Sequence, residues 1–199
     1  MKSICVFCGS SMGNKEIYKS KSRELGEAFL KNKTSLIYGG ANVGLMRIIA
    51  DTVLEGGGEA IGIMPNHLVE KEVAHLGLTK MYITESMQER KVLMAKMSEA
   101  FIAMPGGLGT LDELAEMLTY NQLRIHDKPI GLLNIEGYFD HLLKFLDHAV
   151  EEKYVREEHR KNIIVDDNID ALFEKLNNYK PVLTDKWIHE IKEESHGKV

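Results

Sequence analysis

The chain alternates short, uninterrupted apolar runs with longer amphipathic stretches. The apolar runs have the length and the Ile, Val, Leu, Phe or Met content of strands buried on both faces of a sheet. They are Ser3–Phe7, Ser35–Tyr38, Ala60–Met64, Thr79–Ile83, Ala100–Met104, Ile130–Leu133 and Ile163–Val165. Apolar residues at helical spacing occur in Tyr18–Lys31, Gly44–Leu54, Ser86–Met97, Leu111–Leu123 and Tyr138–Glu151. This alternation predicts an α/β fold, with a parallel sheet of about seven strands and helices on both faces.

The 199 residues are expected to form a single domain, residues 1–199. No linker divides the chain, since there are only 4 Pro and the Gly residues cluster at the predicted strand ends. The least regular stretch, Pro65–Leu78, is a candidate loop over a site. The polar residues 185–199 are expected to form a peripheral C-terminal helix.

Composition excludes several classes of protein. Hydrophobic residues make up 44% and charged residues 28%, which is close to the globular average and unlike disordered, collagenous or coiled-coil chains. The 25 Lys and Arg against 30 Asp and Glu are the opposite of what a long nucleic acid requires. The longest apolar runs are far below the ~18 residues of a membrane helix. We therefore expect a cytoplasmic protein with neither a nucleic acid nor a membrane as partner.

The two cysteines, Cys5 and Cys8, have the C-x-x-C spacing of redox motifs. Such motifs lie at a helix N-terminus, whereas both residues here fall within an extended apolar run. Positions three apart in a strand face opposite sides of the sheet. We therefore expect two buried, small apolar side chains in a reducing compartment.

Glycine-bearing turns follow three of the predicted strands, at residues 8–11, 38–44 and 105–110. Ligands of open parallel sheets bind beyond the carboxyl ends of the strands, at the point where the strand order reverses. Each turn alone is explained by the backbone freedom of Gly. The three together predict one shared crevice.

The common nucleotide and metal signatures are missing from the sequence. There is no G-x-x-x-x-G-K-[ST] motif, and no G-x-G-x-x-G follows the first strand. The second strand ends in Tyr38-Gly39-Gly40, without an acidic residue for a ribose hydroxyl, so an NAD-dependent dehydrogenase is disfavoured. The eight His are scattered, and we predict no metal.

The segment Pro105–Glu113, PGGLGTLDE, is the most informative stretch. Small residues let the backbone approach a ligand, and the first N–H groups of the following helix form a site suited to phosphate. Thr110 adds a hydroxyl donor. Asp112 and Glu113 would repel a phosphate beside them, so a Glu113 that faces the crevice is expected to meet the sugar of the ligand.

Glu113 also has a simpler interpretation. The spacing Thr110-x-x-Glu113 fits a capping box, in which the glutamate bonds back to the N–H of the cap residue. Acidic residues are ordinary at a helix start. The spacing by itself favours capping over a role in the crevice.

A second charged cluster, Glu85–Lys91, begins a helix directly after the fourth predicted strand and should border the same crevice. Arg90 can bind phosphate through two hydrogen bonds, and Lys91 adds a point charge. Cations near a helix N-terminus disfavour the helix, which favours an anionic partner. A solvated face of i,i+4 pairs with Glu85 and Glu89 explains the pattern equally well.

Two stretches together resemble the paired signatures of the LONELY GUY (LOG) family, cytokinin riboside 5′-monophosphate phosphoribohydrolases long mislabelled lysine decarboxylases. They are Met87–Lys91 and Pro105–Glu113, and the likeness extends from about Lys2 to Asp170. The two signatures together are specific, whereas either alone is much weaker. Supporting stretches are Phe7–Ser11, Tyr38–Gly40, Gly44–Met46, Glu72–His75, Gln122–Leu123, His126–Pro129, Leu132–Asn134 and Gly137–Tyr138.

The resemblance implies a Rossmann-like, doubly wound fold, a homodimer with sites near the subunit interface, and no cofactor. It implies hydrolysis of the N-glycosidic bond of adenosine 5′-monophosphates, often N6-substituted, to free base and ribose 5-phosphate. Arg90 and Glu113 match the essential catalytic pair. Positions that match substrate contacts are Glu72, Lys91, Gly106, Gly107, Gly109, Thr110 and Thr119, of which the glycines and Thr110 hold the phosphate.

Four residues depart from the family pattern. Gln88 stands where the family usually has His, and Ala41, Arg47 and Arg124 replace glycines. None belongs to the essential pair, so we expect them to bear on substrate preference rather than on reaction type.

Two other functions are open to this sequence. Related Rossmann-like carriers of nucleotides or of the molybdenum cofactor share a PGGxGT-like turn, although a carrier has no use for the pair Arg90 and Glu113. A lysine decarboxylase normally holds pyridoxal phosphate on a Schiff-base lysine, for which no clear candidate is present.

Overall fold

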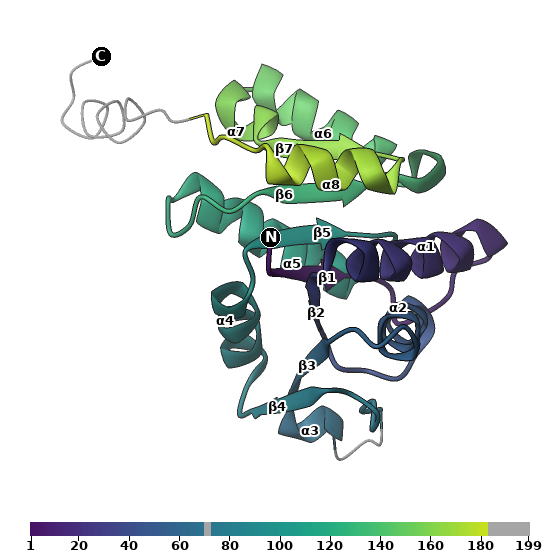
Figure 1. Ribbon diagram of the computed structural model, residues 1–199. Coiled ribbons are helices and arrows are strands. Elements are labelled where there is room, and N and C mark those ends of the chain that lie inside the picture. The colour runs from purple at the N-terminus through teal and green to yellow at the C-terminus, as the bar shows by residue number, and fades with distance from the viewer. Residues whose placement is uncertain (70–72, 183–199) are drawn as a thin grey trace.

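The computed structural model describes residues 1–69 and 73–182, and its centre is a parallel sheet (Figure 1). The order of the seven strands is β4-β3-β2-β1-β5-β6-β7, and every neighbouring pair is parallel. The prediction of a doubly wound α/β fold with about seven strands is confirmed. The strands are β1 (Ser3–Phe7), β2 (Ser35–Tyr38), β3 (Ala60–Pro65), β4 (Lys80–Thr84), β5 (Ala100–Ala103), β6 (Ile130–Leu133) and β7 (Ile163–Asp166).

Helices cover both faces of this sheet (Figure 1). α1, α2 and α8 pack on one face, and α4, α5 and α6 pack on the other. Each face has its own apolar core because the strands are buried on both sides. The helices are α1 (Glu16–Asn32), α2 (Gly44–Glu55), α3 (Asn66–Val69), α4 (Met87–Met97), α5 (Leu108–Gln122), the 3₁₀ helix η1 (Ile135–Gly137), α6 (Asp140–Glu151), α7 (Glu157–Lys161) and α8 (Ile169–Asn177).

The two cysteines take part in different cores. Cys5 packs with the α4–α5 layer and Cys8 with the α1–α2 layer, as the alternation of a strand requires. Both are buried and free, and burial raises the pKa of each thiol. The prediction of two buried apolar side chains is confirmed, and neither thiol has the accessibility of a redox centre.

The element boundaries differ from the prediction in three informative places. α5 begins at Leu108, three residues before the predicted start, because Gly107 is its cap. α6 begins at Asp140, after a turn that contains Tyr138. α8 was not predicted, although its buried residues recur at helical spacing: Ile169, Leu172, Phe173 and Leu176.

The irregular stretch Pro65–Leu78 contains the short helix α3 and a loop. Residues 73–75 of this loop pair with the second glycine turn, through an antiparallel bridge between Ala41 and Ala74. Residues 70–72 and the C-terminal helix predicted over 185–199 lie outside the described residues. Within the described chain, no helix combines the length and the apolar composition needed to cross a membrane.

The strand order reverses between β1 and β5. β2, β3 and β4 follow β1 to one side, and β5, β6 and β7 lie on the other. The loops after β1 and β5 therefore diverge to opposite sides and leave a crevice at the carboxyl edge of the sheet. The predicted glycine turns lie at this edge.

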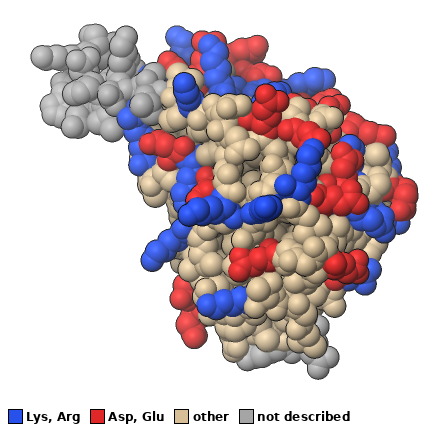
Figure 2. Space-filling view, in the orientation of Figure 1, with Lys and Arg blue, Asp and Glu red and all other residues tan. Residues whose placement is uncertain are grey.

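Charged side chains of both signs are spread over the molecular surface that Figure 2 shows. A row of Lys and Arg side chains crosses the middle of this face, and Asp and Glu lie on both sides of the row. The acidic side chains beside it agree with the formal net charge of −5.

Candidate active site

The first and third glycine turns join directly at the switch point. The backbone N–H of Gly9 donates to the carbonyl of Pro105 at 3.0 Å, which ties the loop after β1 to the loop after β5. The second turn closes on the first, since the N–H of Leu45 donates to the carbonyl of Gly9 at 3.1 Å. The prediction of one crevice is therefore confirmed for the first and third turns, and the second turn joins them through Leu45, the residue that follows it.

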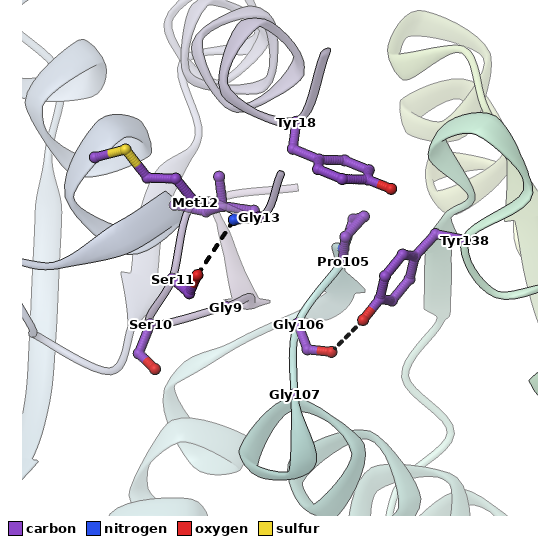
Figure 3. A pocket seen from close by; sticks show the side chains of 11 residues that line it. Gly9, Ser10, Ser11, Met12, Gly13, Tyr18, Pro105, Gly106, Gly107 and Tyr138 are labelled. Atoms are coloured by element: carbon purple, nitrogen blue, oxygen red, sulfur yellow. Dashed lines mark hydrogen bonds between the residues drawn. The ribbon is translucent and has the colours of Figure 1, made fainter. Parts of the chain in front are cut away.

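A cavity of ≈ 270 Å³ lies where these turns meet (Figure 3). Its floor is backbone, from residues 9–13 and 105–107. Its walls are aromatic and apolar, with Tyr18 from α1, Leu45 from α2 and Tyr138 from the turn before α6. Such a mixture of close backbone and apolar walls is typical of small-molecule sites.

Gly106 is the glycine of this turn that sterics require. A Cβ at Gly106 would lie 2.1 Å from Oγ1 of Thr110 and 2.8 Å from the backbone nitrogen of Gly9. A Cβ at Gly107 or at Gly109 would meet nothing within 4 Å, so packing within the described chain does not explain these two. Open space beside a glycine-rich helix start leaves room for a ligand.

The N-terminus of α5 has no side-chain cap. Gly107 occupies the N-cap position and has no side chain to accept from the first-turn N–H groups. By contrast, the hydroxyl of Ser86 caps α4 and the amide oxygen of Asn168 caps α8. Uncapped N–H groups and the helix dipole make the start of α5 suitable for an anion.

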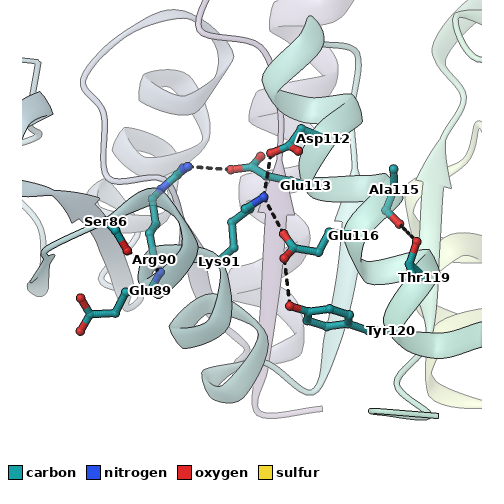
Figure 4. A network of polar contacts seen from close by, with 10 residues as sticks. All are labelled: Ser86, Glu89, Arg90, Lys91, Asp112, Glu113, Ala115, Glu116, Thr119 and Tyr120. Atoms are coloured by element: carbon teal, nitrogen blue, oxygen red, sulfur yellow. Dashed lines mark hydrogen bonds and ion pairs between the residues drawn. The ribbon is translucent and has the colours of Figure 1, made fainter. Parts of the chain in front are cut away.

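Arg90 and Glu113 form a buried ion pair between α4 and α5 (Figure 4). Nη1 of Arg90 lies 2.9 Å from Oε1 of Glu113, and each side chain is 10% exposed. Nε of Arg90 donates to the carbonyl of Ile63 on β3 at 3.0 Å. A Cβ at Gly39 would lie 2.4 Å from Nη2, so the absence of a side chain there makes room for the guanidinium.

The capping interpretation of Glu113 is wrong. α5 is capped by Gly107, so Thr110 lies inside the first turn and Glu113 in the second, where no orphan N–H needs a partner. Capping by a glutamate occurs instead at α4. There Oε2 of Glu89 accepts from the N–H of Glu85 at 2.8 Å.

The environment of Glu113 changes its acidity. Burial raises the pKa of the Glu113 carboxyl, and the Arg90 guanidinium partly opposes this shift. Asp112, the neighbouring acid, also raises it. The carboxyl is therefore a weaker acid and a stronger base than an exposed glutamate.

Lys91 is also held between α4 and α5 (Figure 4). Its Nζ lies 3.0 Å from Asp112 and 2.8 Å from Glu116, and Glu116 in turn accepts from the hydroxyl of Tyr120 at 2.9 Å. The one ammonium is shared by two carboxylates and side-chain exposure of Lys91 is only 14%, so Lys91 is held in the structure and is not a free surface charge. The solvated-face interpretation is therefore wrong for Arg90 and Lys91.

One predicted substrate contact, Thr119, is not among the partners of this pair, and another, Glu72, cannot be placed. Thr119 is exposed on α5, and its hydroxyl donates to the carbonyl of Ala115 at 2.8 Å. Glu72 lies outside the described residues. The role that the family resemblance implies for each stays a prediction.

The departures from the family pattern are not among the partners of Arg90 and Glu113 described above. Gln88 and Arg47 are exposed, and Ala41 is buried in the bridge to Ala74. Arg124 has a φ of 56°, in the left-handed region that favours glycine. An arginine in place of the family's glycine therefore strains this backbone.

Sequence reasoning missed the roles of Gly39, Ile63 and Tyr138. Gly39 was placed in a turn but not against Arg90, and Ile63 contributes only a carbonyl. Tyr138 was noted in the resemblance, and the structure places it in the cavity wall, with its hydroxyl on the carbonyl of Gly106. These contacts join segments far apart in the sequence, so no local pattern reveals them.

The family described as "possible lysine decarboxylase" matches residues 46–176 of this chain. The cytokinin riboside 5′-monophosphate phosphoribohydrolase LOG1 of Arabidopsis thaliana is 46% identical over 90% of the chain and 84% of its own length. LOG5 of the same plant is 42% identical over 91% of the chain and 79% of its own length. The chain belongs to the LOG family. Its Arg90 and Glu113 are the positions that the resemblance marks as the essential pair.

Solved structures with this fold include molybdenum cofactor proteins. The molybdenum cofactor binding protein of Rippkaea orientalis has a TM-score of 0.68 at 23% identity, over 88% of this chain and 95% of that one. The molybdenum cofactor carrier protein of Chlamydomonas reinhardtii has a TM-score of 0.67 at 20% identity, over 89% and 99%. At these identities the likeness establishes the Rossmann-like fold alone.

Proposed function

We propose that this LOG-family protein hydrolyses the N-glycosidic bond of purine nucleoside 5′-monophosphates, AMP or its N6-substituted cytokinin forms. The products are the free base and ribose 5-phosphate. The observation that carries the proposal is the buried pair of Arg90 on α4 and Glu113 on α5, where α5 is the helix whose glycine-rich, uncapped start lines a cavity. The family relatives, 42–46% identical, are named for this reaction.

In the proposed reaction, Glu113 acts at C1′ of the ribose. Breaking the bond from C1′ to the purine nitrogen moves the bonding electrons to the base and leaves positive charge on the sugar. The ionised carboxylate stabilises that charge and accepts a proton from water as the water oxygen bonds to C1′. The base takes up a proton as it leaves, so the reaction consumes one water and needs no cofactor.

Arg90 holds the carboxylate in place for this chemistry. Its Nε and Nη1 are bound to the carbonyl of Ile63 and to Glu113, which fixes the plane of the guanidinium. The same charge opposes the effect of burial on Glu113 and so favours the ionised form. A buried carboxylate without this partner would take up a proton more readily.

The phosphate is assigned to the start of α5, at Gly106, Gly107, Gly109 and Thr110. Glu113 lies six residues beyond Gly107, about 9 Å along the helix axis, a distance that one mononucleotide can span. Phosphate binding at this remote end orients the scissile bond. Asp112 does not oppose it strongly, because its charge is paired with Lys91.

The carrier and decarboxylase alternatives fit this site less well. A cofactor carrier has no need of a buried carboxylate–guanidinium pair beside its anion site. A decarboxylase of the pyridoxal type needs a deprotonated lysine. The hydrogen bonds that Lys91, the lysine next to the pair, donates to Glu116 and Asp112 raise its pKa and so oppose that role.

We further propose a homodimer that forms through the α4–α5–α6 layer. Large apolar side chains on the outside of this layer are exposed, among them Val92, Leu108 and Phe145. α6 is amphipathic, yet Ala149 is its only buried residue. A second copy of the chain would cover these side chains and would lie next to the helix that carries Glu113.

The proposal is tested by incubating the pure protein with AMP and with N6-prenylated AMP, and by separating the products chromatographically. We expect free base and ribose 5-phosphate in equal amounts. The absence of free base from every purine monophosphate tried would overturn the proposed function. Bound ligand that copurifies without turnover would favour the carrier.

A further inference from the structure

Tyr138 makes a direct bond to the glycine turn of the cavity (Figure 3). Its hydroxyl donates to the carbonyl oxygen of Gly106 at 2.6 Å, across 32 residues of sequence. The ring stands in the cavity wall beside Tyr18, with 6.0 Å between the ring centroids and the rings edge to face. The hydroxyl is thus at the boundary between the cavity and the backbone that begins α5.

This bond fixes a peptide that would otherwise turn easily. The carbonyl of Gly106 and the N–H of Gly107 belong to one trans peptide, so they point in opposite directions. Glycine on both sides imposes few steric limits on the rotation of that peptide. While Tyr138 holds the carbonyl, the N–H of Gly107 points away from the Tyr138 hydroxyl and joins the N–H groups at the start of α5.

The turn before α6 is built to put Tyr138 there. Glu136 and Gly137 have φ values of 49° and 72°, and the first is costly for a residue with a side chain. Asn134 closes the turn, because its Oδ1 accepts from the N–H of Phe139 at 2.7 Å and its Nδ2 donates to Asp140 at 2.8 Å. A left-handed backbone conformation at Glu136 requires stabilising contacts around it. In this turn the conformation places the hydroxyl of Tyr138 at the Gly106 carbonyl.

The ring of Tyr138 is fixed independently of its hydroxyl. It packs edge to face on Phe139, with 5.1 Å between centroids, as well as on Tyr18. Removing the oxygen atom alone should therefore leave the ring in place. The role of the hydroxyl can therefore be tested while the ring of Tyr138 stays in the cavity wall.

We propose that Tyr138 is a positioning residue for the phosphate of the substrate, because its hydroxyl orients the Gly106–Gly107 peptide for anion binding. This inference rests on the proposed function only in assigning the start of α5 to a phosphate. It gives the strained turn at residues 136–137 a role in binding.

The test compares wild type with Tyr138→Phe in the full chain. We expect KM for AMP and the dissociation constant of ribose 5-phosphate to rise together by about fivefold to tenfold. We expect kcat to change less than about twofold and the inhibition constant of free adenine to stay unchanged, since the base has no phosphate. Tyr154→Phe, which alters a tyrosine 86% exposed, is the matched control and should change none of these values.

Calorimetry of ribose 5-phosphate separates this inference from the proposed function. A weaker complex in Tyr138→Phe supports the inference whether or not the wild type turns AMP over. An affinity for ribose 5-phosphate within twofold of wild type overturns it, even if the melting temperature falls, because the hydroxyl would then serve stability only. An equal loss of affinity for adenine and for ribose 5-phosphate also overturns it, and so does a wild type that binds no ribose 5-phosphate.

Discussion

At the scale of single residues, the centre of the protein is one carboxylate and the guanidinium that faces it. Glu113 and Arg90 are both buried. The free energy needed to remove two charges from water can exceed the attraction between them. The chain keeps the pair with a further hydrogen bond from Arg90 to the Ile63 carbonyl and with a glycine at position 39. Such an arrangement is costly for stability alone and suits a functional centre.

Replacing Glu113 by Gln should separate binding from turnover. The amide keeps the shape of the side chain and an acceptor for Arg90, yet it can neither stabilise positive charge at C1′ nor accept a proton. We expect kcat to fall about 10³-fold while AMP binds within a few-fold of wild type. The kcat is measured by product chromatography and the binding by calorimetry. Glu152→Gln, at an exposed site, serves as control, and unchanged turnover in Glu113→Gln would remove the carboxylate from the mechanism.

The acidity of Glu113 gives a prediction with a definite sign. Burial raises its pKa above the ordinary value of 4.5, so the carboxylate should protonate at a higher pH than an exposed glutamate. Since the protonated form is favoured in the folded state, this group makes the protein less stable as the pH rises through that range. Carbon-13 NMR of the glutamate carboxyls, assigned with Glu113→Gln, measures the midpoint. A midpoint at or below 4.5 would contradict the prediction.

At the scale of elements, α5 differs from a capped helix because no side chain accepts a hydrogen bond from its first N–H groups. α4 and α8 use their own side chains as caps, whereas α5 begins with glycines. Gly106 is needed for packing, and Gly107 and Gly109 face open space. The turn before α5 is therefore held by hydrogen bonds from the N–H of Gly9 and the hydroxyl of Tyr138. The first N–H groups of α5 are then available to a ligand.

Alanine at Gly106 should lower the stability of the protein, whereas alanine at Gly107 should weaken substrate binding. Gly106→Ala forces a Cβ onto Thr110 and onto backbone, and we expect a loss of about 1–3 kcal/mol in the free energy of unfolding. Gly107→Ala meets nothing within 4 Å, so its stability should change by less than about 0.5 kcal/mol. Its KM for AMP should nevertheless rise at least about tenfold if a phosphate occupies that space. Urea unfolding and steady-state kinetics measure the two effects, and a Gly107→Ala enzyme with normal KM would place the phosphate elsewhere.

At the scale of the whole molecule, the helix layers on the two faces of the sheet differ in how much apolar side chain they expose to solvent. α8 and α1 close one face, with the rings of Phe173 and Phe29 edge to face. The α4–α5–α6 layer leaves large apolar side chains in contact with solvent, including Phe145, which is 63% exposed. Apolar patches of this kind mark interfaces between proteins.

The proposed homodimer predicts the effect of one charge. Phe145→Glu places a carboxylate among the exposed apolar side chains of this layer, and we expect light scattering to show monomers where the wild type forms dimers. Leu76→Glu changes a side chain 97% exposed outside this layer and should stay dimeric. A wild type that is monomeric at micromolar concentration, or a dimer unaffected by Phe145→Glu, would contradict the assignment of the interface.

The sequence by itself determined the seven strands and the switch-point crevice. Strands buried on both faces must be short and apolar, and turns that approach one another closely must contain glycine, so both leave a local signature. The pairing of Met87–Lys91 with Pro105–Glu113 identified the family for the same reason, since each stretch is contiguous. The last residue of the second signature, Glu113, however, admitted two interpretations.

Only the tertiary structure decided between them. Whether Glu113 caps its own helix or meets Arg90 depends on where α5 begins and on how α4 lies beside it, and these are set by packing across the sheet. The contacts of Gly39 with Arg90 and of Tyr138 with Gly106 likewise join segments that are distant in the chain. Local propensity carries no information about such partners, because their proximity is created by the burial of the strands between them.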